Sequence, residues 1–146
     1  MGHFMKTILS QALLIASLLL VPFSAHSRAP VPIVDYPNSS ITTRPGSTLT
    51  VDQVKNAITA AAQSRNWQIS PGPASESLQA VLHVRGKHTV VVDITYTTQS
   101  YSISYQTSTN MKYSITPDTN VRVIHPFYNR WVSDLRESIR LELNRL

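Results

Sequence analysis

The chain has 146 residues and contains no cysteine, which excludes disulfide bonds, thiolate nucleophiles and cysteine-ligated metal sites. Its 13 Lys and Arg side chains outnumber its 8 Asp and Glu side chains, for a formal net charge of +5. The excess is modest and the basic residues are dispersed, with the densest group at Arg85 and Lys87. The charge therefore disfavours a nucleic-acid partner, although a polyanion-binding module stays open as an alternative function.

Residues 1–27 have the three parts of a secretory signal peptide. A basic Lys6 precedes an apolar run from Ile8 to Val21, and Ala25-His26-Ser27 places small residues at the −3 and −1 positions of a cleavage site. The apolar run is roughly 14 residues long, which is shorter than the about 20 residues that a membrane-spanning helix needs. We therefore expect cleavage after Ser27 and release into the periplasm or outside the cell, rather than a transmembrane anchor.

Residues 28–49 are rich in proline, serine, threonine and asparagine and show no sustained hydrophobic periodicity. This composition predicts a flexible, extended arm. Residues 50–146 then form a single domain, because they are enough for one hydrophobic core and too few for two.

The ordered part begins with a helix predicted at residues 51–65. Thr50 and Gln53 have the spacing of a capping box, in which each side chain bonds to the backbone N–H of the other residue. Apolar residues then recur at helical spacing as far as Asn66, a residue that tolerates the left-handed conformation found at helix ends. Several of these residues are alanines, which let the helix approach a sheet closely.

Three segments then alternate apolar and polar residues, as half-buried strands do. Their apolar positions are Leu78, Ala80, Leu82 and Val84 in the first segment, Val90, Val92, Ile94 and Tyr96 in the second, and Tyr101, Ile103 and Tyr105 in the third. With short loops at 85–87 and 97–100, Leu82 pairs with Val90 and Ile94 pairs with Ile103, so the apolar partners share one face. Residues 67–69 supply a short preceding strand.

After a long loop at 107–125, with a brief extended piece at 121–124, Pro126 suits the first position of a second helix. Its apolar stripe begins at Phe127 or Tyr128 and continues with Trp131, Val132, Leu135, Ile139, Leu143 and Leu146. The predicted fold class is α+β. We expect a two-layer domain in which a four-stranded antiparallel meander carries two helices packed on one face, in the order α-β-β-β-β-α.

Five segments between residue 50 and the C terminus carry a resemblance. They are Arg65-Asn66-Trp67, Leu82-His83-Val84-Arg85, Tyr101-Ser102-Ile103-Ser104-Tyr105, Asn110-Met111-Lys112-Tyr113 and, most specifically, Ile124-His125-Pro126-Phe127-Tyr128-Asn129-Arg130-Trp131-Val132. Together they resemble a family of small exported bacterial proteins, many of which are lipoproteins. The resemblance implies export but no particular activity or catalytic residue. The chain departs from the lipoprotein members because it lacks the cysteine that carries their lipid, so we expect no stable membrane anchor.

Two polar constellations suggest catalytic or metal chemistry, and the predicted register argues against both. His83 and His88 point to opposite faces of a hairpin, so one metal ion cannot contact both. His83, Asp93 and Ser104 share the polar face, but His83 lies about 13 Å along the neighbouring strand from Asp93, whereas a catalytic triad needs hydrogen-bond contact. We therefore predict no metal, no cofactor and no enzymatic activity, with an unrecognised hydrolase as an alternative.

The strongest candidate site is the start of the second helix. Its candidate binding residues are His125, Tyr128, Asn129 and Arg130, with Asn110, Lys112 and Tyr113 of the preceding loop as an opposite wall. In the interpretation that we favour, Tyr128 and Trp131 are core anchors and the segment fastens the 107–125 loop to the helix. In the alternative, the Arg130 guanidinium and the aromatic rings bind a peptide, a glycan or an anionic group.

The sequence thus predicts a non-enzymatic exported protein that acts as a binding module of the bacterial envelope. Its partner is expected to be a protein, a glycan or a small ligand.

Overall fold

The computed structural model describes residues 27–146, so the predicted signal peptide, apart from Ser27, lies outside the described residues. In chain order the elements are β1 (Val31–Pro32), β2 (Tyr36–Ser40), α1 (Val51–Ser64), β3 (Gln68–Pro71), β4 (Ser77–Val84), β5 (His88–Tyr96), β6 (Ser100–Thr109), β7 (Ser114–Ile115), β8 (Arg122–Ile124) and α2 (Phe127–Leu143). These strands pair only in the antiparallel sense. Neither helix in this part of the chain is long and apolar enough to cross a membrane.

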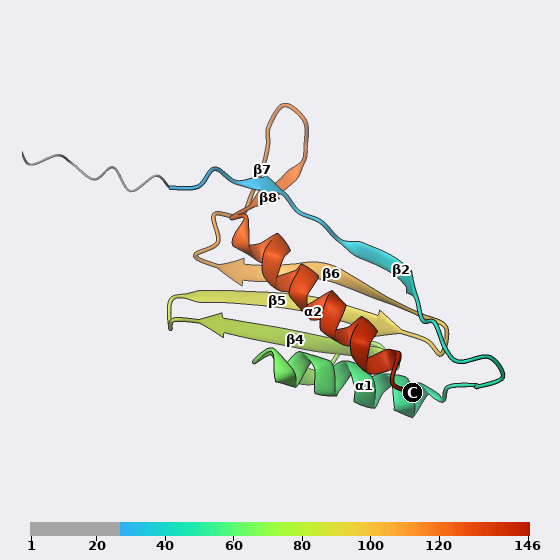
Figure 1. Ribbon diagram of the computed structural model, residues 1–146. Helices are drawn as coiled ribbons and strands as arrows, with labels where there is room; N and C mark the ends of the chain where they lie inside the picture. Colours follow the sequence, from blue (N-terminus) through green and yellow to red (C-terminus); the bar gives the residue numbers. More distant parts are fainter. Residues whose placement is uncertain (1–26) are drawn as a thin grey trace, which may run out of the picture.

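The strands form two sheets instead of the single four-stranded sheet that the sequence predicts. Five strands lie in the order β2-β6-β5-β4-β3, and three short strands lie in the order β1-β8-β7. Both helices cover one face of the five-stranded sheet (Figure 1). Residues on its other face, such as Thr95 and Ser104, are exposed. The α+β class with two helices and antiparallel strands is confirmed, whereas the predicted number of strands and sheets is wrong.

The predicted register of the central hairpins is confirmed. Leu82 pairs with Val90, and Ile94 pairs with both Leu78 and Ile103. The β6 strand nevertheless continues to Thr109, because a bulge between Val91 and Val92 of the β5–β6 pair accommodates one extra residue.

Helix α1 begins and ends as its sequence predicts. The Thr50 side chain accepts a hydrogen bond from the Gln53 amide at 3.2 Å, and the Gln53 side chain accepts one from the Thr50 amide at 2.9 Å. Asn66 follows the helix with a φ of 63°, in the left-handed region. The buried positions of both helices meet the apolar face of the sheet, and the largest fully buried side chains are Tyr128, Ile58, Ile94, Ile103, Ile124, Leu135, Ile139 and Leu143.

The segment predicted to be a flexible arm is instead part of the folded structure, so this prediction is corrected. Strand β1 pairs with β8, and β2 pairs with β6 at the edge of the larger sheet. Prolines are compatible with these strands because each strand pairs on one side only, and a proline lacks just the one backbone donor. Such strands of two and five residues carry too little alternation to be recognised from the sequence.

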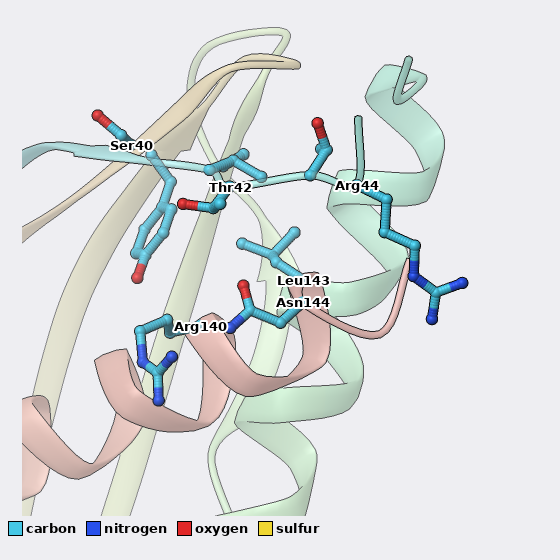
Figure 2. A pocket seen from close by; sticks show the side chains of 9 residues that line it. Ser40, Thr42, Arg44, Arg140, Leu143 and Asn144 are labelled. Atoms are coloured by element: carbon cyan, nitrogen blue, oxygen red, sulfur yellow. The ribbon is translucent and has the colours of Figure 1, made fainter. Parts of the chain in front are cut away.

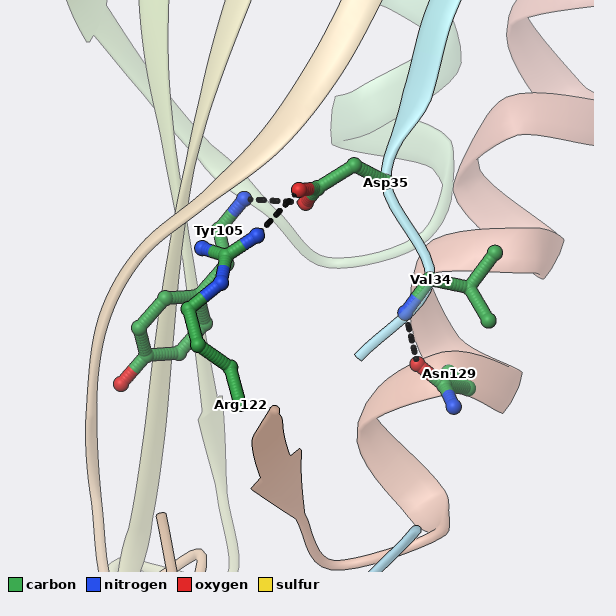
Figure 3. Close-up of polar contacts among 5 residues, drawn as sticks. All are labelled: Val34, Asp35, Tyr105, Arg122 and Asn129. Carbon is green, nitrogen blue, oxygen red and sulfur yellow. Dashed lines mark hydrogen bonds and ion pairs between the residues drawn. The ribbon is translucent and has the colours of Figure 1, made fainter. Parts of the chain in front are cut away.

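Side chains of the second half of the protein hold this N-terminal segment in place (Figure 3). The Asp35 carboxylate accepts hydrogen bonds from the Tyr105 amide at 3.0 Å and from the Arg122 guanidinium at 2.5 Å. Asn129, on the first turn of α2, accepts a hydrogen bond from the Val34 amide at 3.0 Å. These contacts connect β1 and β2 to β6, β8 and α2.

Candidate functional site

A cavity of about 420 Å³ lies where the tip of the β4–β5 hairpin meets the start of α2, and we call it the α2-start pocket. Its lining residues are Val84, Arg85 and His88 from the hairpin, Met111 from the loop after β6, and His125, Phe127, Arg130, Trp131 and Asp134 from the start of α2. Three segments that are distant in the sequence therefore contribute to one cavity.

Hydrogen bonds fix the hairpin side of the α2-start pocket. Arg85 and Gly86 turn the chain with φ values of 53° and 64°, as the tight connection between β4 and β5 requires. Next to this turn, the Asn110 side chain donates to the Lys87 carbonyl at 2.7 Å, and His88 Nδ1 lies 2.9 Å from the Asn110 carbonyl. Because a carbonyl oxygen can only accept, Nδ1 is the protonated nitrogen of His88.

His125 is fixed from the side of the helix. Its backbone N–H donates to the Met111 carbonyl at 2.8 Å, and its Nδ1 accepts from the Phe127 amide at 3.2 Å. Since Nδ1 accepts, the proton of the neutral ring lies on Nε2, which remains a donor. Burial lowers the pKa of His125 below its ordinary value of 6.5, and the positive charges of Lys112 and Arg28 lower it further.

Aromatic rings form the apolar wall of the α2-start pocket. The Phe127 ring centroid lies 4.9 Å from that of His125 and 5.8 Å from that of Trp131. Trp131, which the sequence predicts to be a core anchor, packs against the core with a half-buried side chain and also lines the cavity. Its burial is incomplete because Val132 and Leu135 occupy the face of α2 that points to the sheet.

The charge around the α2-start pocket is mostly positive. Arg85 and Arg130 are exposed, and Asp134 is the one acidic residue among those that line the cavity. The ion pairs within residues 27–146 are Arg122–Asp35, Arg140–Glu137 and Arg145–Glu142, none of which includes either arginine of the pocket. Their charges are thus available to a ligand.

The structure separates the candidate binding residues suggested by the sequence. His125 and Arg130 line the α2-start pocket, and Lys112 is close enough to affect the titration of His125. Tyr128 is fully buried, and burial strongly raises the pKa of its hydroxyl group. Asn129 binds the N-terminal segment, while Tyr113 stacks on Tyr105 with ring centroids 4.8 Å apart.

The backbone hydrogen bond from His125 to Met111 joins two residues of the 107–125 loop and does not itself tie that loop to α2. Asn129 fastens a different partner, the N-terminal segment. Within residues 27–146 the Arg130 side chain takes part in no ion pair, and it is exposed.

Sequence reasoning missed the contribution of the hairpin to this site. Arg85 is recognisable in the sequence as part of the densest basic group, but the sequence pattern suggests His88 only as a metal ligand. The proximity of the hairpin tip to α2 depends on how the helix crosses the sheet, which no local pattern encodes.

A second cavity, of about 430 Å³, lies at the other end of α2 (Figure 2). It is lined by residues 40–44, Tyr101, Arg140, Leu143 and Asn144. Arg140 is already paired with Glu137 at 2.6 Å, and its guanidinium points away from that of Arg44. Within residues 27–146, this cavity therefore has one lining arginine outside an ion pair, Arg44, whereas the α2-start pocket has two.

The constellations considered for catalysis lie as the register predicts. His83 is paired with Thr89, whereas Asp93 lies opposite Ser104 and Gln79, so His83 is four residues along β4 from the level of Asp93. His83 and His88 are not partners in the ladder, because His88 pairs with Val84. Within residues 27–146, no three His, Asp or Glu side chains are grouped so that they could hold a metal ion.

Comparison with protein-family models, with curated proteins and with solved structures yields no match. The resemblance to exported bacterial proteins thus remains a prediction from the sequence. The function has to be argued from the geometry of the site.

Proposed function

We propose that this protein is an exported, non-enzymatic binding module, and that its α2-start pocket binds a small anion carried by an aromatic or aliphatic group. The observation that supports this proposal is that Arg85, Arg130 and two histidines line one cavity together with the apolar side chains of Val84, Met111, Phe127 and Trp131. Export rests on the signal peptide read from residues 1–27.

The anionic part of the ligand follows from the charges. A guanidinium group presents parallel N–H donors that match the two oxygens of a carboxylate or phosphate. Arg85 and Arg130 come from different elements, so they can approach an anion from two directions. The negative charge of Asp134 offsets part of the positive charge of Arg85 and Arg130. The remaining charge favours a ligand with one or two negative charges held near the arginines.

The apolar part of the ligand follows from Val84, Met111, Phe127 and Trp131. Binding cavities for small molecules are typically about 300 to 1,000 Å³ and mostly apolar, with a few polar groups that orient the ligand. A cavity of about 420 Å³ accommodates a single ring or a short aliphatic chain together with its anionic group. A pocket of this size with two lining arginines favours a small ligand over an extended polyanion, which needs a continuous basic stripe.

Calorimetric titration of the chain that begins at Arg28 tests this proposal. Three probes are compared. Phenyl phosphate carries both a ring and a negative charge, inorganic phosphate carries the charge without a ring, and benzyl alcohol carries the ring without a charge. We expect phenyl phosphate to bind most tightly. Equal affinity for phenyl phosphate and benzyl alcohol would show that the charges do not contribute and would contradict the proposal.

The same titration distinguishes the other classes of function. A hydrolase that accepts this probe would release phenol from phenyl phosphate, and steady release would contradict a non-enzymatic role. A polyanion-binding module would bind heparin more tightly than phenyl phosphate, with an affinity that falls steeply with salt.

A further inference from the structure

We propose that removal of the signal peptide completes the α2-start pocket, because the new N-terminal ammonium group of Arg28 becomes an additional cationic group at its rim. The inference rests on the proposed function of this pocket and extends it to the maturation of the protein. It predicts that the processed chain binds anions more tightly than the same chain with residues preceding Arg28.

The described start of the chain lies against the pocket. The Arg28 guanidinium carbon is 4.8 Å from the centroid of the Phe127 ring, and Phe127 lines the pocket. The Ser27 hydroxyl accepts a hydrogen bond from the Lys112 ammonium group. Both Arg28 and Lys112 are near enough to His125 for their charges to lower its pKa. The Ser27–Arg28 peptide bond therefore joins two residues whose side chains contact Lys112 and the pocket residue Phe127, respectively.

Hydrolysis of this bond changes the charge at that position. The reaction consumes one water, leaves a carboxylate on Ser27, which departs with the leader, and leaves an amino group on Arg28. An α-amino group is largely protonated at pH 7, so a neutral amide is replaced by a positive charge.

Cleavage also changes the partners of Lys112. In the uncleaved chain its ammonium group donates to Ser27, whereas in the cleaved chain Ser27 is gone and this donor is released. The Arg28 α-ammonium and the Lys112 ammonium are thereby made available together near His125.

The N-terminal segment is held firmly enough to keep Arg28 in place after cleavage. Asn129 donates to the Pro32 carbonyl at 2.8 Å, and β1 pairs with β8 through Val31 and Pro32. Only two residues separate Arg28 from Val31, the first residue of β1. The new terminus is therefore restrained near the start of α2.

The experiment measures the dissociation constant of phenyl phosphate for three forms of the protein. They are the chain that begins at Arg28, the same chain acetylated selectively at its α-amino group, and a chain that begins at Ala25. We expect the acetylated and the extended forms to bind roughly fivefold more weakly, which is the effect of one partly exposed charge interaction of about 1 kcal/mol.

Two substitutions serve as controls. Lys112→Gln should weaken binding in the chain that begins at Arg28 and have less effect in the extended chain, where Ser27 already engages Lys112. Lys55→Gln, which removes an exposed charge from α1, should have no effect in either form.

The outcomes separate this inference from the function on which it rests. Equal affinity of all three forms, together with a loss of binding in Arg130→Gln, would leave the pocket in place and overturn the role of the new terminus. A lack of phenyl phosphate binding by every form would overturn both.

Discussion

Asn129 binds the backbone on both sides of Ile33, since its side-chain amide donates to the Pro32 carbonyl at 2.8 Å and its side-chain oxygen accepts from the Val34 amide at 3.0 Å. One side chain on α2 thus holds the segment between β1 and β2. We predict that Asn129→Ala lowers the free energy of unfolding by about 1 to 3 kcal/mol, because two hydrogen bonds are lost.

Denaturant unfolding measures this effect, with Asn144→Ala at the other end of α2 as the control. Hydrogen exchange at the Val34 amide should also accelerate in Asn129→Ala. A destabilisation no larger than that of Asn144→Ala would show that Asn129 does not hold the segment.

The sheet register predicts contrasting effects for two adjacent residues. Ile94 is fully buried against the helices, whereas Thr95 is exposed on the open face. Ile94→Ala should therefore cost about 2 to 5 kcal/mol of unfolding free energy, through lost burial and the cavity left behind. Thr95→Ala should cost far less. Comparable losses in thermal or chemical unfolding would contradict the observed register.

The hairpins could be predicted from the sequence because two independent signals agree. Alternation places Leu82 and Val90 on one face, and the short loop at 85–87 allows the two residues to pair. The capping box at Thr50 is similarly local, since its partners are three residues apart. Where the information lies within a few residues, the sequence is sufficient.

The remaining features depend on distant contacts. Strand β1 has two residues and is ordered by β8 and Asn129, which follow it by about ninety positions or more. The α2-start pocket likewise requires Arg85 and Arg130 to meet, although they lie in separate elements of the chain. His125 and Arg130 could be recognised as candidates, but their partners across the cavity could not.

The signal peptide that we expect at residues 1–27 also predicts the mature N terminus. Because Ala25 and Ser27 satisfy the −3 and −1 positions, we expect the exported protein to begin at Arg28. Mass spectrometry of protein recovered from the exported fraction measures this directly. Recovery of the intact chain in the membrane fraction would instead support a transmembrane anchor.

The lowered pKa of His125 predicts a dependence of stability on pH. The unfolded chain takes up a proton at His125 near pH 6.5, and the folded protein does so only at lower pH, because burial, Lys112 and Arg28 oppose the charged ring. The contribution of neutral His125 to stability is therefore complete above pH 6.5 and declines as the pH falls toward the folded-state pKa. His125→Gln should remove this part of the pH dependence.

Titration of the His125 ring by nuclear magnetic resonance gives a second measurement. A bound anion stabilises the protonated ring, so saturating phenyl phosphate should raise the pKa of His125. His83→Gln, on the open face of the sheet, is the control and should leave this response unchanged. An identical His125 titration with and without the probe would place the bound anion elsewhere.

The central claim is that Arg130 serves a ligand rather than the fold, and Arg130→Gln tests it most directly. The reference variant is Arg145→Gln, which makes the same charge change at the other end of α2. Phenyl phosphate affinity and the free energy of unfolding are measured together. We predict that Arg130→Gln weakens binding at least about fivefold, while unfolding changes by less than about 0.5 kcal/mol. Unchanged binding in Arg130→Gln, or equal weakening in Arg145→Gln, would contradict the account.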